Sequence, residues 1–195
     1  LEAFMEKPVQ TIATKATVIE LLESSELTKL PFRNLESFSS EDHAHDEHAH
    51  DEKKHDEYGH HGHRHGEFDP HVWLDPENAK AIVTVIRDPL ARIDAKHAAT
   101  YKSNASATIK RLDDLTAKIR KSLSHAGDYK FITFHDAYQY FEKRFHLPSS
   151  GTLTVSPEVM PGAERLRIIR TKVTKERVNC MLAEPQFNTK LVTTV

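Results

Sequence analysis

Apolar side chains recur along this chain with two different periods. Between Asp94 and His125 there is no proline or glycine, and apolar or small residues return every three or four positions. They are Tyr101, Ala105, Thr108, Leu112, Leu115, Ile119 and Leu123. This stripe predicts one helix over 94–125, roughly 48 Å long at about 1.5 Å per residue. Gly127 is its expected stop.

After residue 127 the pattern changes to short apolar runs separated by helical stretches. Strands are predicted over Lys130–Phe134, Thr152–Val155 and Val178–Ala183, the last apolar enough to be covered on both faces. Asp136 is expected to open a helix between the first two, with Tyr138, Phe141 and Phe145 inward. A second helix is expected through Leu166 and Ile169. This alternation predicts an α/β fold with a parallel sheet.

The chain before residue 94 predicts further elements. Leu1–Met5 suits the tail of a helix, and the partly β-branched run Ala16–Leu22 predicts a strand. In Asp75-Pro76, aspartate is an expected N-cap and proline the first helical residue. The helix that follows is expected to turn inward Ala79, Ile82, Val83 and Ile86. The pair Asp88-Pro89 is expected to interrupt it.

Residues 36–66 are almost without aliphatic side chains and read ESFSSEDHAHDEHAHDEKKHDEYGHHGHRHG. A segment that cannot bury apolar surface cannot build a core, so we interpret it as a disordered insertion. Nine of the 14 histidines lie there: His43, His45, His48, His50, His55, His60, His61, His63 and His65. Imidazole suits zinc, copper and nickel, and the acidic neighbours concentrate cations. The insertion indicates transition-metal handling; the alternative is a solvated loop with no role.

Two further histidines lie in ordered surroundings. His71 lies between Pro70 and Trp73, just ahead of the capped helix, where a rigid turn would fix the geometry of a metal ligand in advance. His135 ends a predicted strand, and ligands collect at the carboxyl ends of parallel strands. A structural histidine at a turn or strand end is the alternative for each.

Other polar residues point less directly to chemistry. Asp136, next to His135, is read first as a helix cap, and Glu184 is either a support for a ligand or structural. Cys180 lies in an apolar strand, where a small buried hydrophobe is the default interpretation. Surface positions are expected for His97, His125 and His146.

The composition excludes several classes of protein. The 195 residues are 38% hydrophobic and 29% charged, with a net charge of −2, which gives no broad basic field for nucleic acid. No apolar run approaches the roughly 20 residues of a membrane span. With one cysteine, no disulfide can form within the chain. The sequence opens at Leu1 without an initiator methionine or a signal peptide, and we expect a piece lacking both ends of a longer chain.

Several stretches together resemble the ZnuA family, the zinc-binding proteins of bacterial ABC importers. Besides the insertion and Leu1-Glu2-Ala3-Phe4, they are DPHVWLDPENA (69–79), YKSNA (101–105), FITFHDAYQYFEKRF (131–145), SPEVMPGAERL (156–166) and CMLAEPQF (180–187). No single motif is diagnostic, but the series keeps the family order over nearly the whole chain.

The resemblance implies two parallel-sheet lobes joined by one long linking helix. Residues 1–75 would then be the end of the first lobe, 76–126 the helices including the linking helix 94–125, and 127–195 the start of the second lobe. The family's zinc ligands map onto His71 and His135, with another ligand outside this sequence. The family cysteine that matches Cys180 pairs with one near the C-terminus, also outside this chain. Manganese-binding relatives carry a carboxylate where this chain has His135, so histidine there favours Zn²⁺.

The function implied is capture rather than catalysis. A periplasmic, monomeric solute-binding protein would bind Zn²⁺ in an interlobe cleft and deliver it to the membrane permease of an ABC transporter. The histidine-rich insertion would collect zinc, sense it or pass it on. A cytosolic metallochaperone with a histidine-rich segment and a manganese- or iron-binding relative are the alternatives. A zinc hydrolase would need a general base, for which the sequence offers no convincing residue.

Overall fold

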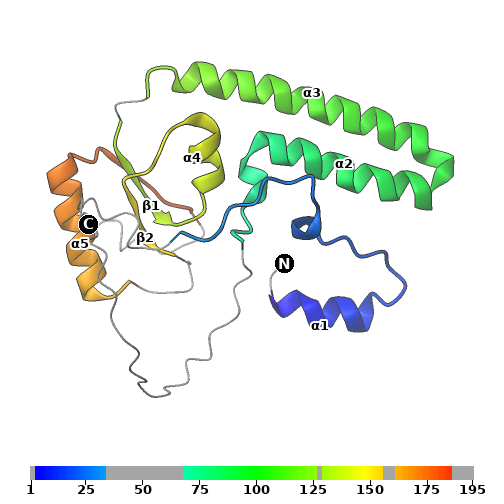
Figure 1. The fold of residues 1–195 in the computed structure, drawn as a ribbon, viewed down its shortest axis with the longest axis horizontal. Coiled ribbons are helices and arrows are strands. Elements are labelled where there is room, and N and C mark those ends of the chain that lie inside the picture. The colour runs from blue at the N-terminus through cyan, green and yellow to red at the C-terminus, as the bar shows by residue number, and fades with distance from the viewer. Residues whose placement is uncertain (1–2, 34–67, 127–128, 156–160, 186–195) are drawn as a thin grey trace, which may run out of the picture.

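The strand–helix alternation after residue 128 folds into the predicted parallel sheet (Figure 1). The structure is a computed structural model that describes residues 3–33, 68–126, 129–155 and 161–185. Its strands are β1 (Phe131–His135), β2 (Gly151–Thr154) and β3 (Cys180–Leu182), in the order β2-β1-β3. Both pairings are parallel, and they place Thr133 between Thr152 and Leu182. The α/β fold class is confirmed.

Two helices connect these strands and lie on opposite sides of the sheet (Figure 1). α4 (Gln139–Phe145) leads from β1 to β2, and α5 (Ala163–Glu176) leads from β2 to β3. Ile169 of α5 packs with Ile132, Phe134 and Leu153 in one core cluster. Because side chains alternate along a strand, His135 belongs to the other face of β1, away from this cluster.

A hairpin of two long helices lies beside the α/β unit (Figure 1). α2 (Pro76–Ile93) and α3 (Ala98–Leu123) are joined by the short turn η4 (Ala95–His97). The predicted long helix is confirmed, although it begins four residues late and its 26 residues span about 39 Å. Its expected inward stripe is at least half-buried except at Leu115, whose place Thr116 takes.

The start of α2 confirms the capping prediction. The Asp75 carboxylate accepts a hydrogen bond from the Glu77 backbone N–H at 2.9 Å, and Pro76 is the first helical residue. An aspartate in this position satisfies one of the backbone donors that a helix start leaves without an intrahelical partner.

The segments on either side of residues 34–67 come together on α4. The segment before residue 34 contains α1 (Ala3–Ile12) and the turn η1 (Leu21–Glu23). The segment after residue 67 contains η3 (Val72–Leu74), which leads into α2. Pro31 and Phe68 form an antiparallel bridge. Leu27, Val72 and Tyr140 then make a second core cluster, which fixes both segments against α4.

Predictions for the N-terminal half are wrong at three positions. Ala16–Leu22 is not a strand, because a strand needs a hydrogen-bonding neighbour and no described strand lies beside it. Asp88-Pro89 does not interrupt α2, which continues to Ile93 along α3, so packing outweighs one missing N–H. Ile86 is exposed rather than inward. The helix that contains Met5 continues to Ile12.

Predictions for the second half need three corrections. β3 lies at the edge of the described sheet and is not covered on both faces, since Cys180 and Leu182 are exposed and only Met181 is half-buried. Asp136 does not cap α4, which begins at Gln139. The buried side chains of α4 are polar or amphipathic, namely Gln139, Tyr140 and Glu142, whereas the three aromatic residues expected inward are half-buried.

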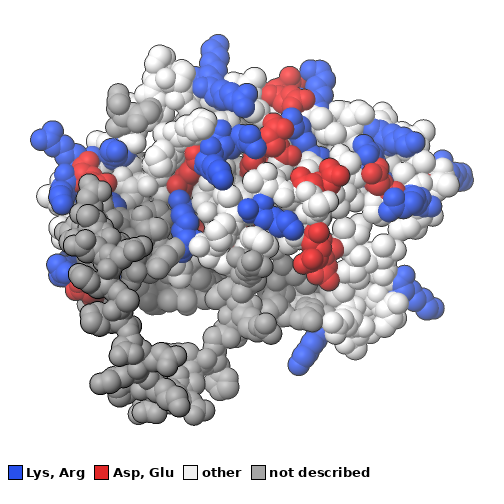
Figure 2. All heavy atoms as spheres, in the orientation of Figure 1, with Lys and Arg blue, Asp and Glu red and all other residues white. Residues whose placement is uncertain are grey.

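Two predictions lie outside the described residues: the stop at Gly127 and the insertion 36–66. In the parts that the structure describes, no helix combines the length and apolarity needed to cross a membrane. The face in Figure 2 mixes basic and acidic side chains, so it offers no extended basic patch for nucleic acid.

Candidate metal centre

The fold brings the two ordered histidines of the sequence together. His71 directly precedes η3, and His135 is the last residue of β1. Their ring centroids lie 5.5 Å apart, with the planes at 60°. Two imidazoles bound to one tetrahedral zinc ion have centroids roughly 5 Å apart, given Zn–N distances of about 2 Å. The spacing therefore suits a shared metal ion.

His71 is held by the carboxylate two residues before it. Its Nδ1 lies 2.6 Å from Oδ1 of Asp69, and its backbone N–H donates to the same oxygen at 2.9 Å. Asp69 is fully buried, and its other oxygen, Oδ2, accepts a hydrogen bond from Nε2 of Gln139 at 2.6 Å. The orientation of the His71 ring is thus fixed by a buried hydrogen-bond network.

His135 has a carboxylate in the equivalent place. Its Nδ1 lies 2.9 Å from Oε1 of Glu184, which also accepts a hydrogen bond from the Tyr138 hydroxyl at 3.0 Å. Burial and then this hydrogen bond raise the pKa of Tyr138 to about 12. Tyr138 therefore stays a neutral donor that holds Glu184 against the His135 ring.

The sheet topology explains why His135 and Glu184 meet. β1 and β3 are adjacent parallel strands, His135 ends β1, and Glu184 follows the end of β3. The helices that follow β1 and β2 lie on opposite faces of the sheet (Figure 1), and in parallel sheets of this kind ligands bind at the carboxyl ends of the strands. The predicted position of His135 at such a strand end is confirmed.

The two carboxylates decide which ring nitrogen is offered to a metal. An ionised carboxylate only accepts hydrogen bonds, so Asp69 places the imidazole proton of His71 on Nδ1, and the negative charge of Glu184, 2.9 Å from Nδ1 of His135, favours a proton at the same position there. The lone pair of a neutral ring is then on Nε2, the nitrogen suited to a metal ion. A carboxylate–histidine pair of this kind also raises the basicity of the ligating nitrogen.

The described residues do not supply a complete set of zinc ligands. Within the four described ranges, no group of three or more histidine, cysteine, aspartate or glutamate side chains has the arrangement of a metal cluster. Zinc takes three or four protein ligands, so the histidine pair needs at least one more donor. The nine histidines from His43 to His65 lie outside the described residues, as does any cysteine partner for Cys180.

The other three described histidines are exposed, as predicted. His97 places Nδ1 2.7 Å from the Asp94 carboxylate, and His125 and His146 are on the surface. The exposed Trp73 lies against the candidate centre, with its ring 5.5 Å from that of His71.

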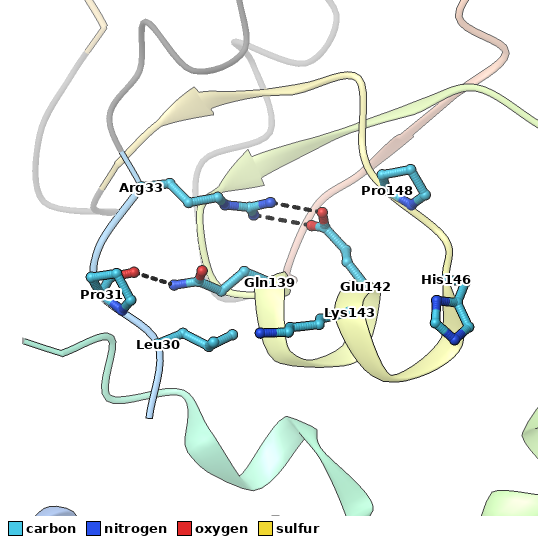
Figure 3. A pocket seen from close by; sticks show the side chains of 8 residues that line it. All are labelled: Leu30, Pro31, Arg33, Gln139, Glu142, Lys143, His146 and Pro148. Atoms are coloured by element: carbon cyan, nitrogen blue, oxygen red, sulfur yellow. Dashed lines mark hydrogen bonds and ion pairs between the residues drawn. The ribbon is translucent and has the colours of Figure 1, made fainter. Parts of the chain in front are cut away.

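An arginine that the sequence did not single out ties the first segment to the strand that bears His135. Arg33 donates to both oxygens of Asp136 and to both oxygens of Glu142, two buried carboxylates. Figure 3 shows the bonds to Glu142. Burial works to lower the pKa of Arg33, but these bonds outweigh it and raise the pKa well above its usual value. Burial raises the pKa of Asp136, and Arg33 counteracts part of that rise.

A second arginine makes the reciprocal connection. Arg144 of α4 binds both oxygens of the Asp75 cap, at 2.6 and 2.7 Å.

Arg33 also borders a surface pocket of about 670 Å³ with Gln139 and His146 (Figure 3). Its lining does not include the histidine pair, so it is separate from the candidate centre.

Comparison with known proteins identifies the family of this chain. The family model described as "Zinc-uptake complex component A periplasmic" matches residues 1–195. The chain is 45% identical over 207 residues to the high-affinity zinc uptake system protein ZnuA of Brucella abortus. It is 34% identical over 203 residues to the protein of that name from Yersinia pestis. All of the chain is matched, and it spans 62% and 60% of the length of these relatives.

Solved structures show the same fold. A Zn(II)-bound mutant variant of AdcAII from Streptococcus pneumoniae matches with a TM-score of 0.57 and 35% identity, covering 65% of this chain and 46% of that one. A crystal structure of ZnuA matches with a TM-score of 0.58 and 27% identity, covering 65% of this chain and 49% of that one.

Proposed function

The chain belongs to the ZnuA family of zinc-uptake components, and from this premise we propose that it captures Zn²⁺ through His71 and His135. The loaded protein, in the periplasm, would deliver the ion to the membrane permease of an ABC transporter. The family description names a transport component rather than an enzyme. The observation that carries the proposal is the facing pair of rings, each with a carboxylate close to Nδ1, which is buried at Asp69 and half-buried at Glu184.

The donor set favours zinc over a harder ion. Asp69 and Glu184 both lie against Nδ1 of a histidine and support imidazole ligands instead of presenting oxygen to the metal. Manganese and calcium prefer carboxylate, carbonyl and water ligands, whereas imidazole suits zinc. The pair would therefore hold Zn²⁺ as cargo, with the remaining ligand supplied by other parts of the protein.

The rest of the proposed organisation follows the family. Residues 1–75 would form the end of one lobe, 76–126 the helices that link the lobes, and 127–195 the start of the other, with the metal in the cleft between them. The histidines from His43 to His65 would form a weaker, auxiliary zinc-collecting segment. Cys180 would form a disulfide with a cysteine outside this chain; its exposure leaves it accessible for that pairing.

Zinc affinity and stoichiometry by chelator competition test the proposal. The full-length protein is compared with a deletion of residues 43–65 and with the double variant His71→Ala, His135→Ala. We expect the tight site to survive the deletion and to be lost in the double variant. Tight binding lost only on deletion of 43–65 would contradict the proposal and favour a metallochaperone whose histidine-rich segment is the binder.

A further inference from the structure

Gln139 is a buried polar side chain whose amide has one possible orientation. Its Nε2 donates to the carbonyl of Pro31 at 3.0 Å and to Oδ2 of Asp69 at 2.6 Å. Both partners only accept hydrogen bonds, so the amide nitrogen, and not its oxygen, must face them. Figure 3 shows this side chain reaching from the first turn of α4 to Pro31.

Asp69, which Gln139 binds through its carboxylate, is also held through its backbone. The Asp69 backbone N–H donates to the carbonyl of Leu30 at 2.9 Å, and the Tyr140 hydroxyl donates to the Asp69 carbonyl at 2.9 Å. The two carboxylate oxygens have different partners: Oδ2 accepts the hydrogen bond from Gln139, and Oδ1 faces Nδ1 of His71. The bond from Gln139 to Oδ2, together with the bond from the His71 backbone N–H to Oδ1, therefore fixes which way the carboxylate is turned.

Gln139 also belongs to the polypeptide that carries the second histidine. His135 ends β1, and the chain runs through a short turn directly into α4, which begins at Gln139. His71 lies on the separate segment that leads into α2. Hydrogen bonds from Gln139 to Asp69 and from Asp69 to His71 therefore link His71 to the chain segment that carries His135.

We propose that Gln139 is a positioning residue of the zinc site: by binding Oδ2 of Asp69 it holds Oδ1 against Nδ1 of His71 and so sets the His71 ring against His135. This inference rests on the proposed function. Glu184 supports His135 directly, so the role of Gln139 is confined to the His71 half of the site. Loss of the outer partner of a ligating histidine typically lowers metal affinity roughly 10–100-fold.

The test replaces Gln139 with methionine, which keeps the length and volume of the side chain and removes its N–H donors. Lys143→Met, at an exposed position of the same helix, is the matched control. Zinc affinity of the full-length protein is measured by chelator competition. The proton position on His71 and on His135 is read from long-range ¹H–¹⁵N NMR of the zinc-free protein at one fixed pH.

We expect Gln139→Met to weaken zinc binding roughly 10–100-fold and to mix the His71 tautomers while His135 keeps its own. Lys143→Met is expected to match the wild type in both measurements. Gln139→Asn, too short to span both acceptors, serves as the second variant if the methionine variant does not fold, with the same expectation.

The inference is overturned if a folded Gln139 variant binds zinc like the wild type. It is equally overturned if affinity falls while the His71 tautomer is unchanged, since that outcome indicates a general structural role. Failure of the proposed function is a separate result: the double variant His71→Ala, His135→Ala would then keep tight zinc binding in the same assay, whatever Gln139 does.

Discussion

Oε1 of Glu184 lies 2.9 Å from Nδ1 of His135, at the ends of two adjacent parallel strands. Asp69 faces Nδ1 of His71 at 2.6 Å. The two histidines come from segments far apart in the sequence, yet each has a carboxylate close to the same ring nitrogen. This repeated arrangement distinguishes a prepared pair of metal ligands from two histidines that merely fill space.

Glu184→Gln tests the carboxylate behind His135. The amide has the same size but no charge, so it supports the His135 tautomer less strongly, and we expect zinc affinity to fall roughly 10–100-fold. Chelator competition measures the change. Glu164→Gln, an exposed glutamate paired with Arg167, is the control and is expected to leave zinc binding unchanged. Equal zinc affinities for Glu184→Gln and the wild type would contradict the assignment.

Trp73 should report the occupancy of the site. It is the one tryptophan of the chain, and its ring lies 5.5 Å from His71. Zinc binding at the histidine pair is expected to change its fluorescence with a midpoint equal to that of the tight site. In Trp73→Phe the signal should be lost while chelator competition still detects tight binding. A wild-type fluorescence midpoint different from that of the tight site would show that the tightly bound ion lies elsewhere.

Zinc binding should also weaken in acid. Both ligands must be neutral to bind, and histidine side chains gain a proton between about pH 8 and 5, so protons compete with the ion. We expect zinc affinity to fall from pH 7.5 to 5.5 and the number of protons released on binding to rise. Calorimetry in buffers of different ionisation enthalpy measures both quantities. A constant zinc affinity across this range would contradict histidine ligation.

Local pattern was enough to predict the elements that carry the site. β1 with His135 at its end, the Asp75 cap of α2 and the long helix α3 all follow from periodicity and capping chemistry within a few residues. The strand predicted at Ala16–Leu22 failed because strand formation depends on a partner, which the local sequence does not reveal. Cys180 was misplaced for a related reason, since an apolar run does not show that its strand lies at an edge.

The residues that organise the site were harder to find. Gln139 and Arg33 act across segments joined only by the fold, and a lone glutamine or arginine has no pattern of its own. Asp69, in contrast, could have been found from the sequence, because an acidic residue two positions before a candidate histidine ligand can bind the ring of that histidine. Asp136 looked like a cap, but its buried position beside Arg33 made it the acceptor of an ion pair.

The ion pairs of Arg33 and of Arg144 should contribute differently to the free energy of unfolding. Arg33→Met leaves two buried carboxylates, Asp136 and Glu142, without their cation and is expected to cost roughly 3–5 kcal/mol. Arg144→Met leaves Asp75 still capping α2, and Arg144 is partly exposed, so about 1–2 kcal/mol is expected. Urea unfolding measures both costs. A larger loss for Arg144→Met would contradict this order.

Asp94 should stabilise the turn between α2 and α3 at neutral pH and lose this effect in acid. Its carboxylate lies 2.7 Å from Nδ1 of His97 and accepts from the Tyr101 hydroxyl at 3.0 Å. The bond from His97, and then that from Tyr101, hold the pKa of Asp94 below its ordinary value. The folded state therefore binds a proton less readily than the unfolded chain, whose aspartates titrate near about 4.

It follows that the stabilisation is complete above about pH 4 and is lost as the pH falls through the lowered folded value. Asp94→Asn, which has no charge to lose, should have a lower urea midpoint than the wild type at pH 7, and the gap should narrow toward pH 3. Asp114→Asn, an exposed aspartate paired with Lys110, is the control, with a small effect expected. A gap for Asp94→Asn as wide at pH 3 as at pH 7 would mean that the side chain's shape, rather than its charge, stabilises the turn.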